Sequence, residues 1–190
     1  KTKLEGATLA TFISIGHCLE KVSEECVLYL TKDSFEFRKR DPGENGIQVF
    51  ASVSVNEVNF CEYLIQSKAN DVICARVSLK NLMRAFKSSD RAEFTQMKLT
   101  KKGQVPCFSF LSETEFTIAQ DVPILKLLSK ESMEDYREPS LSPPEISIQF
   151  PDPRHVKTVI ERMKVMDKFV YVTLNIKGTL IFKVQTEVVC

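Results

Sequence analysis

The chain lacks long apolar runs, a leader pattern and cysteines at metal-binding spacing. Its apolar runs span only a few residues, so we expect no segment to cross a bilayer. The N-terminus shows no charged-then-apolar signal pattern. Six cysteines are scattered without a C-x-x-C pair, and the only histidines are His17 and His155. We therefore expect reduced thiols, mostly buried, in an intracellular protein, with no disulfide, metal or other cofactor.

Catalytic motifs are also missing. The sequence has no G-x-S-x-G, Walker-type glycine loop, H-E-x-x-H or G-x-G-x-x-G. His17 and Cys18 are neighbours on a predicted helix, where adjacent side chains diverge, so they do not form a nucleophile–base pair. We expect no enzymatic activity. The net charge of +1, from 26 cations and 25 anions, argues against a wholly basic nucleic-acid binder but permits a locally basic surface.

A unit made of a strand, an amphipathic helix and two paired strands occurs twice. The first copy runs from Lys3 to about Arg40, and the second from Ile146 to about Thr186. Leu19-Glu20-Lys21-Val22 near the end of the first helix is echoed by Ile160-Glu161-Arg162-Met163 in the second. Such duplication predicts two similar domains. The predicted helices are 7–23 and 153–166, and the paired strands are 26–30 with 35–39 and 169–174 with 179–184.

The residues between the two copies complete the first domain and then change character. Alternating apolar residues predict strands, and Ser78 is placed to cap a helix over 79–88 with its side chain. Residues 1–126 therefore predict an α+β domain dominated by antiparallel sheet. Residues 127–145 hold three prolines and five acids and predict a partly extended connector. Residues 146–190 form a second domain that we expect to be truncated. The strands predicted in the first domain are 49–55, 60–65, 72–77, 93–100, 105–111 and 116–124, with a turn at 43–46.

The helices carry cations on one face. At about 100° per residue, Lys80, Arg84 and Lys87 form a stripe roughly a third of a turn from the apolar side, and Arg91 extends it. The first helix ends near Lys21. The last helix carries Lys157 and Lys164, while its Val156, Val159, Ile160 and Met163 are predicted to face inward. A solvated helix face is one interpretation. The other is a shallow basic track that contacts duplex phosphates without reading sequence, since no exposed aromatics are interleaved for single strands.

The order of several segments resembles the Hus family of checkpoint sliding-clamp subunits. The matching features are Val105-Pro106-Cys107, Asp121-Val122-Pro123-Ile124, the proline-bounded connector, Ile146-Ser147-Ile148 and Thr186-Glu187-Val188-Val189-Cys190. Leu79–Lys87 resembles the second helix of that family. The resemblance implies a PCNA-like sliding-clamp fold with two similar domains and helices on one face of the sheets. The second domain lacks several elements that family members have.

The resemblance also implies partners and site residues. It implies a heterotrimeric ring (the 9-1-1 complex) of this chain and two unlike clamp subunits, closed around double-stranded DNA in the nucleus. A clamp loader would place the ring at DNA damage, where it recruits checkpoint and repair proteins. Leu125, Leu127 and Leu128 in or beside the connector would dock partners, or else pack under the loop. The residues implied to face the channel are Lys21, Lys80, Arg84, Lys87, Arg91, Lys157 and Lys164; those implied at the subunit edge are Phe116, Thr117, Ile118, Ala119, Gln120, Asp121 and Val122.

Two other functions stay open at the level of sequence. A homotrimeric replicative processivity clamp would have the same fold. A signalling scaffold domain without nucleic-acid contact would carry the same cations as a solvated surface. The oligomeric state of the complete protein separates the two clamps, and the salt dependence of duplex binding separates a clamp from a scaffold.

Overall fold

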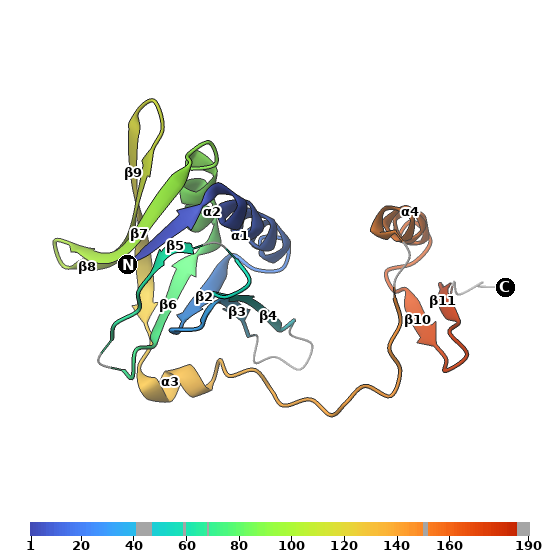
Figure 1. Cartoon of the computed structure of the whole chain (residues 1–190). Helices are drawn as coiled ribbons and strands as arrows, with labels where there is room; N and C mark the ends of the chain where they lie inside the picture. Colours follow the sequence, from blue (N-terminus) through green and yellow to red (C-terminus); the bar gives the residue numbers. More distant parts are fainter. Residues whose placement is uncertain (41–46, 59, 68, 150–151, 186–190) are drawn as a thin grey trace. The chain divides into compact units, whose positions relative to one another are not determined.

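The computed structural model describes residues 1–40, 47–58, 60–67, 69–149 and 152–185, which form two compact units, Lys1–Glu138 and Pro139–Cys190 (Figure 1). The turn predicted at 43–46 and the family-like segment at 186–190 lie outside the described residues.

The first unit contains one nine-stranded sheet in which all neighbouring strands are antiparallel (Figure 1). The strand order is β4-β3-β2-β6-β9-β8-β7-β1-β5. This arrangement confirms the predicted antiparallel α+β class. The strands are β1 (Thr2–Glu5), β2 (Glu25–Leu30), β3 (Ser34–Lys39), β4 (Val49–Ser54), β5 (Phe60–Tyr63), β6 (Ile73–Ser78), β7 (Phe94–Lys102), β8 (Val105–Glu113) and β9 (Thr117–Leu127); the helices are α1 (Gly6–Leu19), α2 (Leu79–Ser88) and α3 (Lys130–Glu134).

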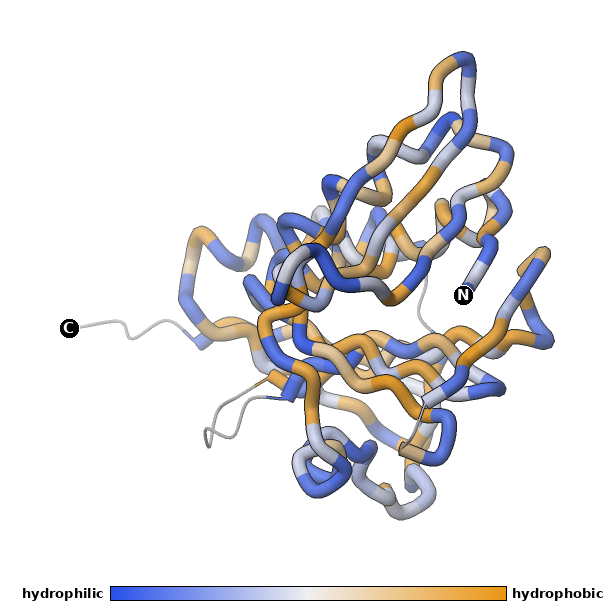
Figure 2. The backbone as a smooth tube through the Cα atoms, turned by 90° about the vertical axis from the view of Figure 1, so that its left-hand side faces the viewer, coloured by the Kyte–Doolittle hydropathy of each residue, from blue (hydrophilic) through white to orange (hydrophobic). Residues whose placement is uncertain are grey.

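Helices α1 and α2 cover one face of this sheet, here called the inner face, and the core lies beneath them (Figure 1). Alternating apolar residues in the strands supply the sheet side of the core, and the alternation is visible along the backbone in Figure 2. Phe12 of α1 lies 4.4 Å from Phe35 and 5.9 Å from Phe86 of α2, measured between ring centroids. Gly16 is buried where the helices meet, and a Cβ added there would lie 2.0 Å from the Met83 sulfur. Any side chain at this position therefore requires the Met83 side chain to shift.

The ends of α1 and α2 differ from the sequence prediction. Helix α1 was predicted to reach residue 23 but ends at Leu19, so Lys21 and Val22 lie in the following turn, and both are exposed. Helix α2 has the predicted bounds, but the Ser78 side chain makes no capping hydrogen bond. The Leu79 amide instead donates to the Glu24 carbonyl at 2.9 Å. The backbone immediately before β2 therefore accepts a hydrogen bond from one amide of the first turn of α2.

The opposite, outer face of the sheet carries a smaller cluster. Val27, Cys74 and Leu128 are buried there, and Met133 and Tyr136 from α3 and the turn after it pack against them. Strand β9 runs to Leu127 and the first unit extends to Glu138. The first part of the segment predicted as connector is therefore folded onto the outer face, because its apolar residues find partners on β2 and β6.

The second unit consists of α4 (Pro153–Met163), β10 (Tyr171–Leu174) and β11 (Leu180–Lys183), with the two strands paired antiparallel. None of its described residues is buried. Val159 is 45% exposed, so the expectation that the apolar face of this helix lies in a core is wrong for the structure as described. Residues 146–149 form no strand. Their counterpart in the first unit, β1, pairs with β5 on one side and with β7 on the other. The sheet of the second unit consists of β10 and β11 alone among the described residues, so it has no two strands between which residues 146–149 could pair.

The cysteines divide into two groups. Cys26, Cys74 and Cys107 are buried and Cys18 and Cys61 are exposed, all as free thiols. Burial raises the pKa of the Cys26 and Cys74 thiols to about 12, so both remain protonated at neutral pH. The prediction of buried thiols therefore holds for Cys26, Cys74 and Cys107 and is wrong for Cys18 and Cys61.

Candidate nucleic-acid and subunit interface

The cationic stripe of α2 is the clearest charged feature on the inner face. Lys80, Arg84 and Lys87 are exposed on α2, and Arg91 is exposed in the turn that follows. Leu79, Leu82, Met83, Ala85 and Phe86 are buried beneath them, which fixes the rotation of the helix. None of these four cations forms an ion pair with another residue that the structure describes. Their charges are therefore available to a negatively charged ligand.

The surface beside this stripe is not uniformly positive. Helix α1 turns small and polar residues outward, and its Thr11 and Ser14 hydroxyls donate to carbonyls of their own helix. Lys21 is exposed after the end of α1. Lys80 shares a depression of about 440 Å³ with Glu20 and Glu24. Sequence periodicity on single helices could not reveal these acids as neighbours of Lys80, because they come from the loop between α1 and β2.

Two of the predicted channel residues belong to the other unit. Lys157 on α4 lies 3.7 Å from Glu161, and Lys164 follows the last helical residue and is exposed. Arg154 is held by Asp152 at 2.6 Å. The structure thus groups Lys80, Arg84 and Lys87 on one helix and leaves Lys157 and Lys164 on a separate unit, where one of the two is already paired.

Strand β9 has a free edge along its first half. Residues 117–123 pair with β8, whereas on the other side only Ile124, Lys126 and Leu127 pair with β6. Among the described residues, the stretch before Ile124 therefore has backbone groups along one side without a neighbouring strand. Unpaired edges of this kind accept a strand from another chain.

The side chains predicted at this edge are not equivalent. Phe116 precedes the strand and is 75% exposed, and Thr117 and Ala119 are exposed within it. Val122 is 1% exposed and faces the core, so its side chain cannot contact a partner and only its backbone lies at the edge. The Asp121 carboxylate pairs with Lys102, and this contact lowers the pKa of Asp121.

The free edge begins next to the end of the cationic helix. Lys87, Arg91, Phe116 and Ile118 line one depression of about 740 Å³, together with Asp90 and Glu115. The predicted channel residues and the predicted edge residues were separate sets in the sequence, and the fold brings part of each set to the same place.

The three leucines predicted to dock partners separate in the structure. Leu125 and Leu127 are about half exposed on β9, while Leu128 is buried against Val27 and Cys74. Leu128 therefore packs under the connector segment, which was the other interpretation of its sequence, and is not available to a partner.

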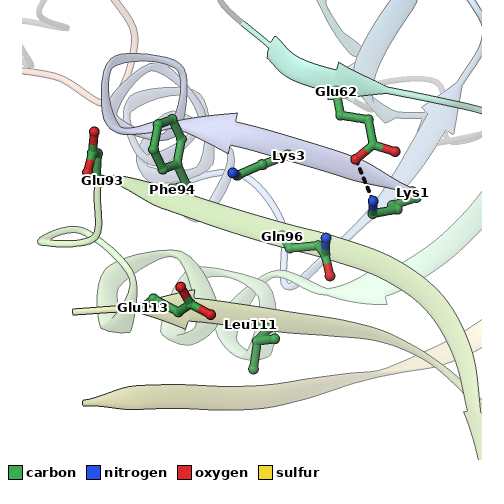
Figure 3. A pocket seen from close by; sticks show the side chains of 8 residues that line it. All are labelled: Lys1, Lys3, Glu62, Glu93, Phe94, Gln96, Leu111 and Glu113. Carbon is green, nitrogen blue, oxygen red and sulfur yellow. Dashed lines mark ion pairs between the residues drawn. The ribbon is translucent and has the colours of Figure 1, made fainter. Parts of the chain in front are cut away.

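Sequence reasoning missed a shallow depression on the outer face (Figure 3). It is about 330 Å³ in volume, and neighbouring strands β1, β5, β7 and β8 contribute most of its lining. The Lys3 ammonium lies 4.2 Å from the centre of the Phe94 ring, and Lys1 pairs with Glu62 at 2.5 Å. The period-two alternation of these strands was the signal that could have located it, because residues alternating with buried ones share the opposite face.

Among the described residues, no cluster of three or more side chains suited to holding a metal is present. In the same part of the chain, no helix has the length and apolar character needed to span a membrane.

The fold defines the class of protein. Two solved structures share it: the PCNA2–PCNA3 complex from Sulfolobus tokodaii and PCNA from Thermococcus kodakaraensis. Each is 14% identical to this chain, with a TM-score of 0.62. Both matches cover 98% of this chain; they cover 69% of the first solved chain and 73% of the second. The chain therefore has the PCNA-like clamp fold, as predicted.

Within this class, the chain belongs to the Hus1-like protein family, whose profile matches residues 1–190. Checkpoint protein HUS1 of Homo sapiens is 29% identical over 196 residues, covering 98% of this chain. The checkpoint protein hus1 homologue of Dictyostelium discoideum is 28% identical over 88% of the chain, and hus1 of Schizosaccharomyces pombe is 25% identical over 95%. These matches span 69%, 63% and 63% of the lengths of the three relatives.

Proposed function

We propose that this chain is a non-enzymatic subunit of a heterotrimeric checkpoint clamp that encircles duplex DNA in the nucleus. Membership of the Hus1-like family and the PCNA-like fold support a clamp subunit. The observation that carries the DNA-facing part is the cationic stripe of α2, which forms no ion pair within the described part of the chain. Lysine and arginine at spaced positions attract phosphates without reading bases, as sliding requires.

The free half of β9 is proposed as one ring-closing edge. Its open backbone can extend the sheet into a neighbouring subunit, and closing a ring removes an edge that would otherwise favour aggregation. The exposed ring of Phe116 and the side chains of Thr117 and Ala119 would then contact the neighbour, with Val122 contributing backbone alone. The proposed partners are two unlike clamp subunits, a clamp loader, and checkpoint and repair proteins.

Retention on DNA tests the encircling role. Rings assembled from the natural full-length chain and its partners are loaded on nicked circular duplex and washed at moderate salt. We expect wild-type rings to stay on circles and to leave after linearisation. The triple change Lys80→Glu, Arg84→Glu and Lys87→Glu should release most rings from circles while leaving assembly intact. Unchanged retention of this variant would contradict the DNA-facing role of α2.

The assembly itself distinguishes the remaining functions. A stable self-trimer of the full-length chain would favour a replicative clamp, and a requirement for unlike chains supports the checkpoint clamp. A salt-independent, weak association with duplex would favour the scaffold function instead.

The edge is tested with Phe116→Ser, since loss of an exposed aromatic should weaken ring assembly without lowering the thermal midpoint of the single chain. Leu99→Ser, at an exposed apolar position of β7, is the matched control. Equal assembly of both variants would contradict the proposed edge.

A further inference from the structure

A row of cations crosses four neighbouring strands on the outer face of the first unit. Arg38 of β3 pairs in register with Val27 of β2, Val27 with Arg76 of β6, and Arg76 with Lys126 of β9. Residues directly opposite each other in a sheet share a face. Strands lie about 4.8 Å apart, so the row from Arg38 to Lys126 is roughly 14 Å long.

A depression of about 330 Å³ lies at the Arg38 and Arg76 end of this row. Its lining includes Lys39, Arg40 and Tyr136 in addition to Arg38 and Arg76, and Glu25 is the only acid in it. The depression therefore has a marked positive charge, and it is large enough for a single anionic group and its neighbours but not for an extended polymer.

Two arginines of the depression, Arg38 and Arg40, contact the segment after α3. Arg38 is almost fully buried, bonds Glu36 at 2.6 and 2.7 Å, donates to the Tyr136 carbonyl at 2.8 Å and stacks on the Tyr29 ring at 3.8 Å. Arg40 donates to the Asp135 carbonyl. Together these arginines fix the segment after α3 as one wall of the depression.

The charge of Arg76 is not matched in the same way. Its Nε is buried and has no hydrogen-bond acceptor among the residues that the structure describes. The nearest carboxylate oxygen, on Glu25, is 3.6 Å away, which is within ion-pair range but too long for a hydrogen bond. Lys126, directly opposite Arg76, is exposed and forms no ion pair with any described residue. Like charges directly opposite each other destabilise a sheet.

We propose that this row binds a phosphorylated segment of a partner protein. The phosphate lies between Arg76 and a second cation, which is either Lys126 or Arg40. An acidic side chain that flanks the phosphorylated residue contacts whichever of these two cations is left. Arginine guanidinium groups match phosphate oxygens in charge and geometry. In an extended peptide, residues two positions apart are about 7 Å apart, so a phosphate and a nearby acid reach different cations of the row. The site lies on the face opposite α1 and α2 and does not depend on the proposed contact of α2 with DNA.

Fluorescence anisotropy tests the proposal with the full chain. The probe is a short labelled peptide that carries one phosphoserine flanked by aspartates, and its unphosphorylated twin is the reference. We expect the phosphopeptide to bind about tenfold more tightly than the twin, which corresponds to one charge-assisted hydrogen-bonded contact. Arg76→Gln with Lys126→Gln should remove this preference, and added inorganic phosphate should compete.

The control variant removes the same charge from another strand of the same sheet. Lys98→Gln with Lys101→Gln, at exposed positions of β7, should leave the preference unchanged. Equal binding of the two peptides, or equal losses in both double variants, would overturn the proposal. Competition by a short duplex DNA that is lost in the Arg76 and Lys126 variant would assign the row to nucleic acid and also overturn it.

Thermal unfolding supplies a second measurement. If only a bound anion offsets the charge repulsion between Arg76 and Lys126, Lys126→Gln should leave the thermal midpoint of unfolding unchanged or raise it in phosphate-free buffer. A clear fall in the midpoint would show that Lys126 stabilises the fold, and the argument from unmatched charge would fail. Arg38 is left unchanged in every variant because its removal would detach the segment after α3.

Discussion

Helices α2 and α4 have the same kind of sequence and very different surroundings. Both are amphipathic, and both carry cations away from their apolar residues. Helix α2 buries five residues against a nine-stranded sheet, and its cations form no ion pair with any residue that the structure describes. Helix α4 buries none, and Arg154 and Lys157 are paired with neighbouring acids. An amphipathic pattern therefore predicts a helix and its rotation, while the partner sheet decides whether the apolar face is buried.

The largest expected effect comes from truncating the core under α2. Phe86→Ala should lower the free energy of unfolding by about 3–5 kcal/mol, because Phe86 is fully buried against Phe12 and Phe110. The matched change on α4, Val159→Ala, should cost within about 0.5 kcal/mol because Val159 is half exposed. Urea unfolding followed by far-ultraviolet circular dichroism measures both. Similar losses would show that α4 is packed as firmly as α2.

The contact between α1 and α2 gives the next effect. Gly16→Val should destabilise the first unit by about 1–3 kcal/mol, because any side chain at this position meets Met83. Ala10→Gly and Ala10→Val, on the exposed side of α1, together measure the intrinsic helix difference between glycine and valine without the clash. Subtracting this difference from the effect of Gly16→Val in urea unfolding isolates the packing cost. A packing cost of zero would mean that Met83 moves aside freely.

Charge neutralisation on the two helices tests their different availability to DNA. In assembled rings, Lys80→Gln with Arg84→Gln and Lys87→Gln should reduce the salt slope of duplex binding by roughly 3, about one for each lost phosphate contact. Lys157→Gln with Lys164→Gln should reduce it by less than about 2, because Lys157 is already paired with Glu161. Slopes are measured as the affinity for duplex against salt concentration. A larger change on α4 would reverse the assigned roles of the two helices.

The capping residues give a smaller and more local effect. The Asp152 carboxylate accepts from the Arg154 amide at 2.9 Å at the start of α4, while the Ser78 side chain makes no such bond at the start of α2. Asp152→Ala should therefore increase amide exchange in the first turn of α4, and Ser78→Ala should leave α2 unchanged. Hydrogen exchange measured by NMR reads both turns in each variant. A loss of protection in α2 after Ser78→Ala would restore the capping role expected from sequence.

Much of the first unit could be predicted from the sequence, because local patterns determine it. The bounds of α2 and the strands around it follow from periodicities of 3.6 and 2. The burial of Leu128 could not be predicted in this way, since it depends on Val27 and Cys74, which are distant in the chain. The same holds for Val122, whose inward orientation on β9 is set by the register with β8. The outer row of cations was missed because its members come from three strands that are not consecutive in sequence.

The pH dependence of α4 is the smallest effect. Contact with Arg154, through its side chain and its amide, lowers the pKa of Asp152. A carboxyl whose folded-state pKa is depressed stabilises the fold above its unfolded value of about 3.9 and loses this contribution as pH falls through the folded-state pKa. Amide protection at the start of α4 should therefore be constant from neutral pH to about pH 5 and decline below about pH 4. The first turn of α2 has no acidic residue and no capping side chain, so its protection should not change over this range. A parallel decline in both helices would indicate that the chain unfolds as a whole in acid, and the local role of Asp152 would then be wrong.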